Sequence, residues 1–257
     1  MKLYHYTTFT NFCSIWLQQK LKFSEWTNCN DVYEREKTYK YTQLSLKHNG
    51  KTYPPGVLKQ FSTKVFEEVE RYHQLSFCLD YENIKGYASP SMWGHYARDY
   101  QRSGVCVEIE STKVIPLPNG AKIYEEKVDY NSILAPIHLC GVDAEKEDAA
   151  QEFVIMNRKQ LFFQKHRHWE MENEYRYISK DCEYLDISDA VITVYVLGED
   201  DITLQLVKRI VMDTKKISYL YMSGLDILEL NSMSLHDKEE LQEEMKYINK
   251  NSVLDTE

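Results

Sequence analysis

The spacing of apolar residues predicts a chain of short strands and helices in irregular order. Residues 2–7 alternate around Tyr4 and Tyr6, which is typical of a strand, and Thr8 or Thr10 can cap a helix that follows. Similar patterns predict strands at 21–24, 75–79, 105–109, 122–128, 174–179 and 191–197, short strands near 218 and 227, and helices at 57–73, 90–97, 148–165, 201–209 and 236–250.

These elements lack the regular strand–helix alternation of a doubly wound sheet, which favours the α+β class. We expect a mixed, mostly antiparallel sheet core with peripheral helices. The chain shows no internal repeat and no long linker, so a single domain over residues 1–257 is the simplest organisation. Within it, the polar motifs fall in a core at about 1–198, and a helical extension is expected at about 199–257.

The net charge narrows the range of partners. It is formally −9, and an acidic chain repels the phosphate backbone of nucleic acids, so non-specific DNA or RNA binding is not expected. One basic run, Lys165–His168, falls at the predicted end of the helix at 148–165, where such side chains are usually solvated.

The cysteines and the lengths of the apolar runs indicate in which cellular compartment the protein is expected. None of the six cysteines is spaced as C-x-x-C, and several lie in apolar runs, as expected of small buried side chains in a reducing environment. The chain opens without a signal-peptide pattern, and no apolar run approaches the ~20 residues that span a bilayer. We therefore expect a cytoplasmic protein with no membrane partner.

Several familiar motifs are missing from the sequence. It contains no G-x-G-x-x-G, no H-E-x-x-H and no G-x-S-x-G. The segment Gly50–Thr52 resembles the end of a phosphate loop, but Ser45 occupies the position of the required glycine. His166 and His168 lack a carboxylate at defined spacing and are interpreted as a surface pair, so no metal is expected.

Polar and aromatic residues that carry chemistry gather in four segments. Each segment also has a structural interpretation: a core histidine, a turn with a helix cap, core aromatics, and a cross-strand pair. The candidate residues are His5, Tyr6 and Thr7; Ser24, Asn30, Asp31 and Glu34; Trp93 and Tyr96; and Glu172, Glu174 and Arg176.

Together, the four segments resemble the bacterial domain-of-unknown-function 2971 family in the same order. Its members open with a Leu-Tyr-His-Tyr-Thr/Ser strand, followed by a Phe-Ser…Asn-Asp…Glu loop. A Met-Trp…Tyr-Ala helix then leads to Gly-Val-Cys, and a late strand carries Trp-x-x-Glu-x-Glu-Tyr-Arg. The resemblance extends to about Gly198, with one departure at Val32, where a proline often follows the Asn-Asp.

A second resemblance suggests a reaction. The opening strand is similar to that of ADP-ribosyltransferases with a His-Tyr-Glu triad, which implies an ADP-ribosyltransferase-like fold with NAD as substrate. By that resemblance, His5 would hold a ribose hydroxyl, Tyr96 would stack on nicotinamide, and Glu174 would stabilise the cationic sugar. The residues implied to bind the rest of the nucleotide are Tyr6, Thr7, Ser24, Asn30, Asp31, Trp93 and Arg176.

Three functions therefore compete at the level of sequence. The first is an NAD-consuming ADP-ribosyltransferase or NAD glycohydrolase, serving as a toxin or defence effector, with an unknown acceptor macromolecule. The second is a metal-dependent phosphodiesterase or nuclease that uses Asp31, Glu34, Glu172 and Glu174. The third is a non-catalytic module that binds a nucleotide or a partner.

Overall fold

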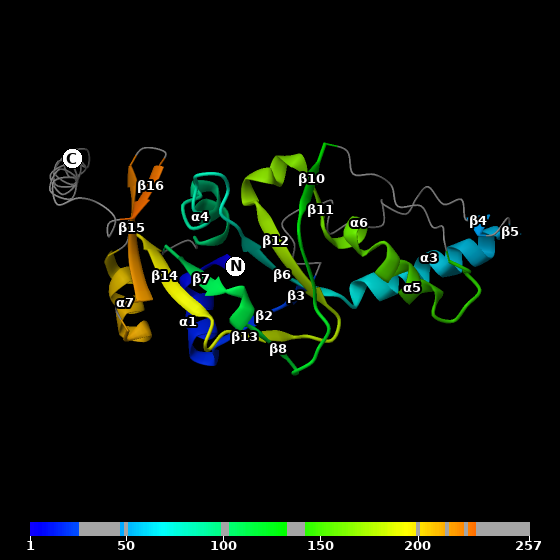
Figure 1. The fold of residues 1–257 in the computed structure, drawn as a ribbon, viewed down its shortest axis with the longest axis horizontal. Coiled ribbons are helices and arrows are strands. Elements are labelled where there is room, and N and C mark those ends of the chain that lie inside the picture. The colour runs from blue at the N-terminus through cyan, green and yellow to red at the C-terminus, as the bar shows by residue number, and fades with distance from the viewer. Residues whose placement is uncertain are drawn as a thin grey trace, which may run out of the picture.

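The computed structural model describes residues 1–25, 47–48, 51–98, 103–132, 142–198, 201–213, 216–223 and 226–229. A nine-stranded sheet forms its centre, in the order β16-β15-β14-β7-β1-β6-β12-β9, with β3 also paired to β6 (Figure 1). Its strands are β1 Lys2–Thr7, β3 Ser24–Glu25, β6 His73–Cys78, β7 Val105–Glu110, β9 Tyr124–Lys127, β12 Glu174–Ser179, β14 Val191–Leu197, β15 Ile217–Ser223 and β16 Asp226–Glu229.

Within this sheet β14 and β15 run parallel, and every other pairing is antiparallel. The predicted α+β class, with a mixed and mostly antiparallel sheet, is therefore confirmed.

Smaller sheets and the helices surround the main sheet. The short strands are β2 Lys20–Lys22, β4 Lys47–His48, β5 Lys51–Thr52, β8 Ile115–Leu117, β10 Asp129–Asn131, β11 Gln164–His166 and β13 Tyr184–Asp186. They pair as β2-β13-β8, β10-β11 and β4-β5. The helices are α1 Phe9–Gln18, α3 Pro55–Glu70, α4 Pro90–Tyr96, α5 Ala149–Met156, α6 Arg158–Phe162 and α7 Asp201–Val211, with 3₁₀ turns η3 Ser111–Lys113 and η4 Arg167–Glu172.

Local sequence signals explain the elements that border β1. Thr8 caps α1 by accepting a hydrogen bond from the Asn11 backbone N–H, and Pro90 occupies the first turn of α4, where its missing N–H is not needed. Gly104 then brings the chain against β1: a Cβ there would lie 2.1 Å from the Thr7 carbonyl oxygen. Only glycine permits this approach, which starts β7 beside β1.

The sheet divides into two parts that we call the β1 half (β16, β15, β14, β7 and β1) and the β6 half (β6, β12, β9 and β3). On the β1 half, apolar residues such as Leu3 pack with α1 and α7, whereas Tyr4 and Tyr6 face a core formed with α4. A third core lies under α3, α5 and α6 and includes Ile178 of the β6 half (Figure 1).

One predicted helix is wrong. The pattern at 148–165 was expected to form a single helix, but α5 ends at Met156, α6 ends at Phe162, and β11 follows. Asn157 separates α5 from α6: its backbone, with φ −101° and ψ 13°, departs from helical geometry, and its side-chain amide and backbone N–H both donate to the Phe153 carbonyl. The segment therefore turns back as a strand that pairs with β10.

The segment after Gly198 was predicted as a helical extension. Its described part contributes α7 and also two strands, β15 and β16, which continue the main sheet from β14. The helix predicted at 236–250 lies outside the described residues. Among the helices that the structure describes, none has both the length and the apolar character needed to cross a membrane.

Candidate functional site

A cavity of about 680 Å³ lies where the two halves of the sheet separate. Along the described strands, β1 and β6 pair only at Tyr4 and Cys78, although β1 pairs with β7, and β6 with β12, along their whole lengths. Past that one pair, β1 and β6 diverge. The cavity therefore has walls from both halves, and α1 and β2 also line it.

The pairing of β6 with β12 brings three polar side chains together, those of Ser76, Glu174 and Arg176. Glu174 pairs with Cys78 and Arg176 pairs with Ser76, so all four side chains alternate onto one face. Asn173 precedes them in a left-handed conformation, and its side-chain amide donates to the backbone carbonyls of Leu79 and Asp80. This turn joins η4 to β12 and carries Glu172 to the same cavity.

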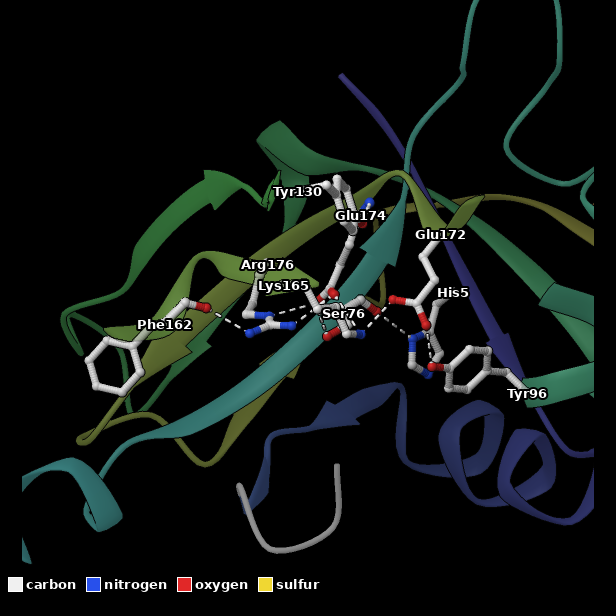
Figure 2. Close-up of polar contacts among 9 residues, drawn as sticks. All are labelled: His5, Ser76, Tyr96, Tyr130, Phe162, Lys165, Glu172, Glu174 and Arg176. Atoms are coloured by element: carbon white, nitrogen blue, oxygen red, sulfur yellow. Dashed lines mark hydrogen bonds and ion pairs between the residues drawn. The ribbon is translucent and has the colours of Figure 1, made fainter. Parts of the chain in front are cut away.

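Two carboxylates and two cations form an ion cluster beside the opening (Figure 2). The Lys165 ammonium lies 2.5 Å from Glu172 Oε2 and 3.3 Å from Glu174 Oε2. Arg176 donates from Nε to Glu174 Oε1 at 2.5 Å and from Nη2 to Glu174 Oε2 at 2.8 Å. The Ser76 hydroxyl donates to Glu174 Oε1 at 2.5 Å. Both oxygens of Glu174 are therefore engaged, which fixes this carboxylate in place.

The ion cluster is almost completely buried. The exposed fractions are 5% for Lys165, 4% for Glu172, 3% for Glu174 and 0% for Arg176. Arg176 also donates from Nη1 to the Phe162 carbonyl at 2.6 Å. Two positive and two negative charges balance formally, which is the condition under which charged groups tolerate burial. Removing any one member would leave an uncompensated charge in the interior.

The two carboxyl groups differ in how readily they bind a proton. Burial alone would raise the pKa of Glu174, but attraction to Arg176 and Lys165, with hydrogen bonds from Arg176 and Ser76, outweighs it and lowers the pKa to about 2. Burial raises the pKa of Glu172, and the nearby Glu174 charge adds to that rise against the opposing pull of Lys165. Glu174 is therefore the permanently ionised member, and Glu172 is the one that accepts a proton first.

The His5 imidazole lies in the opening between the strands. Its Nδ1 is 3.2 Å from the Ser76 carbonyl oxygen, and because a carbonyl can only accept, we assign the ring proton to Nδ1 and a lone pair to Nε2. Burial lowers the pKa of His5, although the bond to Ser76 opposes this. The ring is therefore neutral near pH 7.

Strand alternation places His5 on the opposite face of β1 from Tyr4, which shares a face with Cys78 and Glu174. His5 and Glu174 nevertheless line the same cavity, because the gap between β1 and β6 connects the two faces. The two residues therefore line one cavity from opposite faces of the sheet, at the gap between β1 and β6.

Helix α4 supplies one aromatic residue to the cavity and one to the core. The Tyr96 hydroxyl donates to Glu172 Oε1 at 2.5 Å (Figure 2). Trp93, expected to bind the ligand, does not line the cavity: it is 4% exposed and packs edge-on against Tyr6, with ring centres 5.3 Å apart. The Trp93 indole N–H donates to the Tyr87 carbonyl at 2.8 Å, so its polar atom is also used within the core.

The cavity brings together most of the candidates that the structure describes. Those that line it are His5, Tyr6, Thr7, Ser24, Tyr96, Glu172, Glu174 and Arg176. Asn30, Asp31 and Glu34 lie outside the described residues, so their expected place in the site stays a prediction.

Lys165 lines the cavity but was not among the residues predicted from the sequence. We expected a solvated side chain at a helix end, but Lys165 lies in β11 and is buried between Glu172 and Glu174. The sequence held one indirect signal. Glu172 and Glu174 lie beside a single cation, Arg176, in the sequence. If both glutamates are buried, a second cation is needed nearby to balance their charge.

The same contacts bear on metal binding. Among the described residues, no group of three or more histidine, cysteine, aspartate or glutamate side chains is arranged to hold a metal ion. Glu172 and Glu174 are already engaged by Lys165 and Arg176. The alternative metal site therefore depends on Asp31 and Glu34, both outside the described residues.

Comparison with known proteins gives a partial assignment. The family model described as "Protein of unknown function (DUF2971)" matches residues 92–177, which confirms the predicted resemblance over that segment. The matched segment includes Tyr96 and the whole ion cluster, but it begins after β1 and β6, the strands that carry His5 and Ser76. No curated protein and no solved structure matches the chain.

Proposed function

We propose that the chain binds NAD in the cavity and breaks the bond between nicotinamide and its ribose. The released ADP-ribose is passed either to water or to an acceptor macromolecule. The observation that carries the proposal is the meeting of His5, Tyr96 and two glutamates, from separate segments, in one cavity. Its volume of about 680 Å³ is within the range typical of sites for small molecules and cofactors.

The chemistry requires a stabiliser of positive charge. As the C1′–N bond breaks, nicotinamide leaves with the bonding electrons as a neutral molecule, and the sugar acquires oxocarbenium character. Water or another nucleophile then adds at C1′ and loses a proton. A fixed carboxylate close to the sugar lowers the energy of this transition state.

Glu172 suits this role better than Glu174, to which the sequence resemblance pointed. Glu174 contacts two cations, Arg176 and Lys165, and also accepts from Ser76, whereas Glu172 contacts only one of these cations, Lys165. Glu172 is bound by Lys165 and by the neutral hydroxyl of Tyr96. Its raised pKa also suits a group that accepts the proton of an attacking water.

His5 and Tyr96 take positioning roles in this proposal. Neutral His5 accepts a hydrogen bond from a ribose hydroxyl at Nε2 while Nδ1 donates to Ser76. Tyr96, held by its hydroxyl on Glu172, offers its ring to the nicotinamide. Both contacts orient the sugar so that C1′ faces the Glu172 carboxylate.

The experiment measures free nicotinamide after purified protein is incubated with NAD, with and without a bacterial extract as a source of acceptors. Parallel reactions contain magnesium or EDTA. We expect release that EDTA does not abolish. Glu172→Gln should lower the rate about 10²- to 10³-fold, because it removes a transition-state charge contact. Glu147→Gln, an exposed matched change, should leave the rate unaltered.

The other outcomes separate the remaining hypotheses. Magnesium-dependent cleavage of RNA or DNA would support the phosphodiesterase. NAD binding without any release of nicotinamide would support a non-catalytic module. An equal rate in wild type and Glu172→Gln, with both folded, would contradict the role given to Glu172.

A further inference from the structure

Helix α1 presents a polar face to the cavity. Phe9 and Phe12 are buried in the core, while side chains three or four residues apart on another face border the cavity. These are Asn11, Ser14 and Gln18, joined by the N-cap Thr8 and by one apolar residue, Ile15. A helix of ten residues is about 15 Å long, so this face offers hydrogen-bonding groups along an extended ligand.

Two lysines follow directly in β2. Lys20 and Lys22 alternate onto one face, whereas Leu21 between them is 1% exposed and packs in the core. Both lysine side chains line the cavity. Lys22 lies two residues before Ser24, which pairs with Gln74 of β6.

The chain that follows the two lysines meets β6 at some distance from Glu174, because Ser24 pairs with Gln74. Glu174 pairs with Cys78, four residues along β6 from Gln74, and a strand advances about 3.3 Å per residue. Ser24, two residues after Lys22, is therefore about 13 Å from Glu174 along β6. In Figure 2, α1 and the following strand lie across from the ion cluster.

Among the described residues that line the cavity, positive charges outnumber negative ones, although the chain as a whole is acidic. Of the charged lining residues, Lys165 and Arg176 are balanced by Glu172 and Glu174. Three further described cations line the cavity, Lys20, Lys22 and Arg98, and none forms a close ion pair with another residue in the described part of the chain. Lys20 is the cross-strand neighbour of the partly exposed Asp186 and, after the hydrogen bonds from Ser188, helps to lower the pKa of that carboxyl, so its charge is partly offset. In a protein of net charge −9, this local excess favours an anionic ligand.

We propose that Lys20 and Lys22 bind the phosphate groups of a nucleotide whose sugar end lies at Glu172. The inference rests on the proposed function, since it assigns two sets of residues that line the same cavity to two parts of one ligand. It goes further by assigning the phosphate groups of that ligand to β2. The polar face of α1 contacts the sugars of the ligand.

The test is calorimetric binding of ADP-ribose, adenosine and inorganic pyrophosphate, which needs no turnover. The variant is Lys20→Gln/Lys22→Gln, and the matched control is Lys59→Gln/Lys64→Gln, two exposed lysines of α3. We expect wild type to bind ADP-ribose more tightly than adenosine. The β2 variant should raise the Kd for ADP-ribose about tenfold, weaken its dependence on salt, and leave adenosine binding unchanged.

The outcomes separate this inference from the proposed reaction. Lysine-dependent binding of ADP-ribose without any nicotinamide release supports the phosphate site and contradicts the cleavage of NAD. Nicotinamide release with equal Kd values in wild type and the β2 variant contradicts the phosphate site alone. If the two lysines are needed to bind pyrophosphate and ADP-ribose does not bind, the site takes free phosphates only, and the proposal of a nucleotide ligand is contradicted. No binding of any probe overturns the inference.

Discussion

Replacing Glu174 by glutamine tests the physical basis of the ion cluster. The substitution keeps the shape of the side chain but removes one of two negative charges, so Lys165 and Arg176 are left with one compensating carboxylate. Glu174 is 3% exposed and accepts hydrogen bonds from three side chains. Breaking a buried ion pair from one side costs about 3–5 kcal/mol. In a chain of this size, that corresponds to a melting temperature lower by about 6–20 °C.

The assay is thermal unfolding followed by circular dichroism at pH 7, with Glu126→Gln as the matched control. Glu126 lies on the neighbouring strand β9, and its partner Arg158 is 3.8 Å away and partly exposed. Loss of that pair should cost about 1 kcal/mol or less. If Glu174→Gln melts within a degree or two of wild type, like the control, the cluster is not a tightly coupled charge network and the reasoning fails.

Two further predictions concern the same network. Lys165→Met and Glu172→Gln should each lower the free energy of unfolding measured by denaturant titration. The double variant should lose roughly 1–3 kcal/mol less than the sum of the two single losses. For the exposed residues Lys59 and Glu147, the losses caused by Lys59→Met and Glu147→Gln should be additive. Because the pKa of Glu174 is lowered from 4.5 to about 2, its contribution is present above pH 4.5 and is lost as pH falls toward 2. The contribution of Glu174 to the free energy of unfolding is about 3 kcal/mol, so the melting temperature of wild type should fall steeply across that pH range. An equally steep fall in Glu174→Gln would contradict the assignment of this pH dependence to Glu174.

Elements governed by local signals could be predicted from the sequence. β1 follows from strict alternation, and α4 follows from Pro90 at its first turn. The helix at 148–165 could not, because its apolar spacing continues past the point where Asn157 takes up a backbone carbonyl. Nothing in the local pattern indicates that Lys165 must be buried, since its partners Glu172 and Glu174 come later in the chain.

The candidate site was predicted in outline but not in its geometry. Motif residues such as His5, Tyr96 and Glu174 could be grouped from the sequence because they share no local structural role. The gap between β1 and β6 depends on non-local pairing, so local patterns could not indicate that His5 and Glu174 line one cavity from opposite faces of the sheet. The ADP-ribosyltransferase resemblance implied that Trp93 binds the ligand, but Trp93 packs against Tyr6 in the core.

The division of the sheet into two halves also affects the order in which the chain can fold. The strands of the two halves are interleaved in sequence: β1 is followed by β3 and β6, then β7, then β9 and β12, then β14 to β16. No contiguous fragment contains one half alone, so neither half can fold ahead of the other as an independent unit. Both walls of the cavity depend on contacts between distant segments, a topology associated with slow folding. A fragment of residues 92–177 would carry the ion cluster but neither β1 nor β6, and the cavity could not close around it.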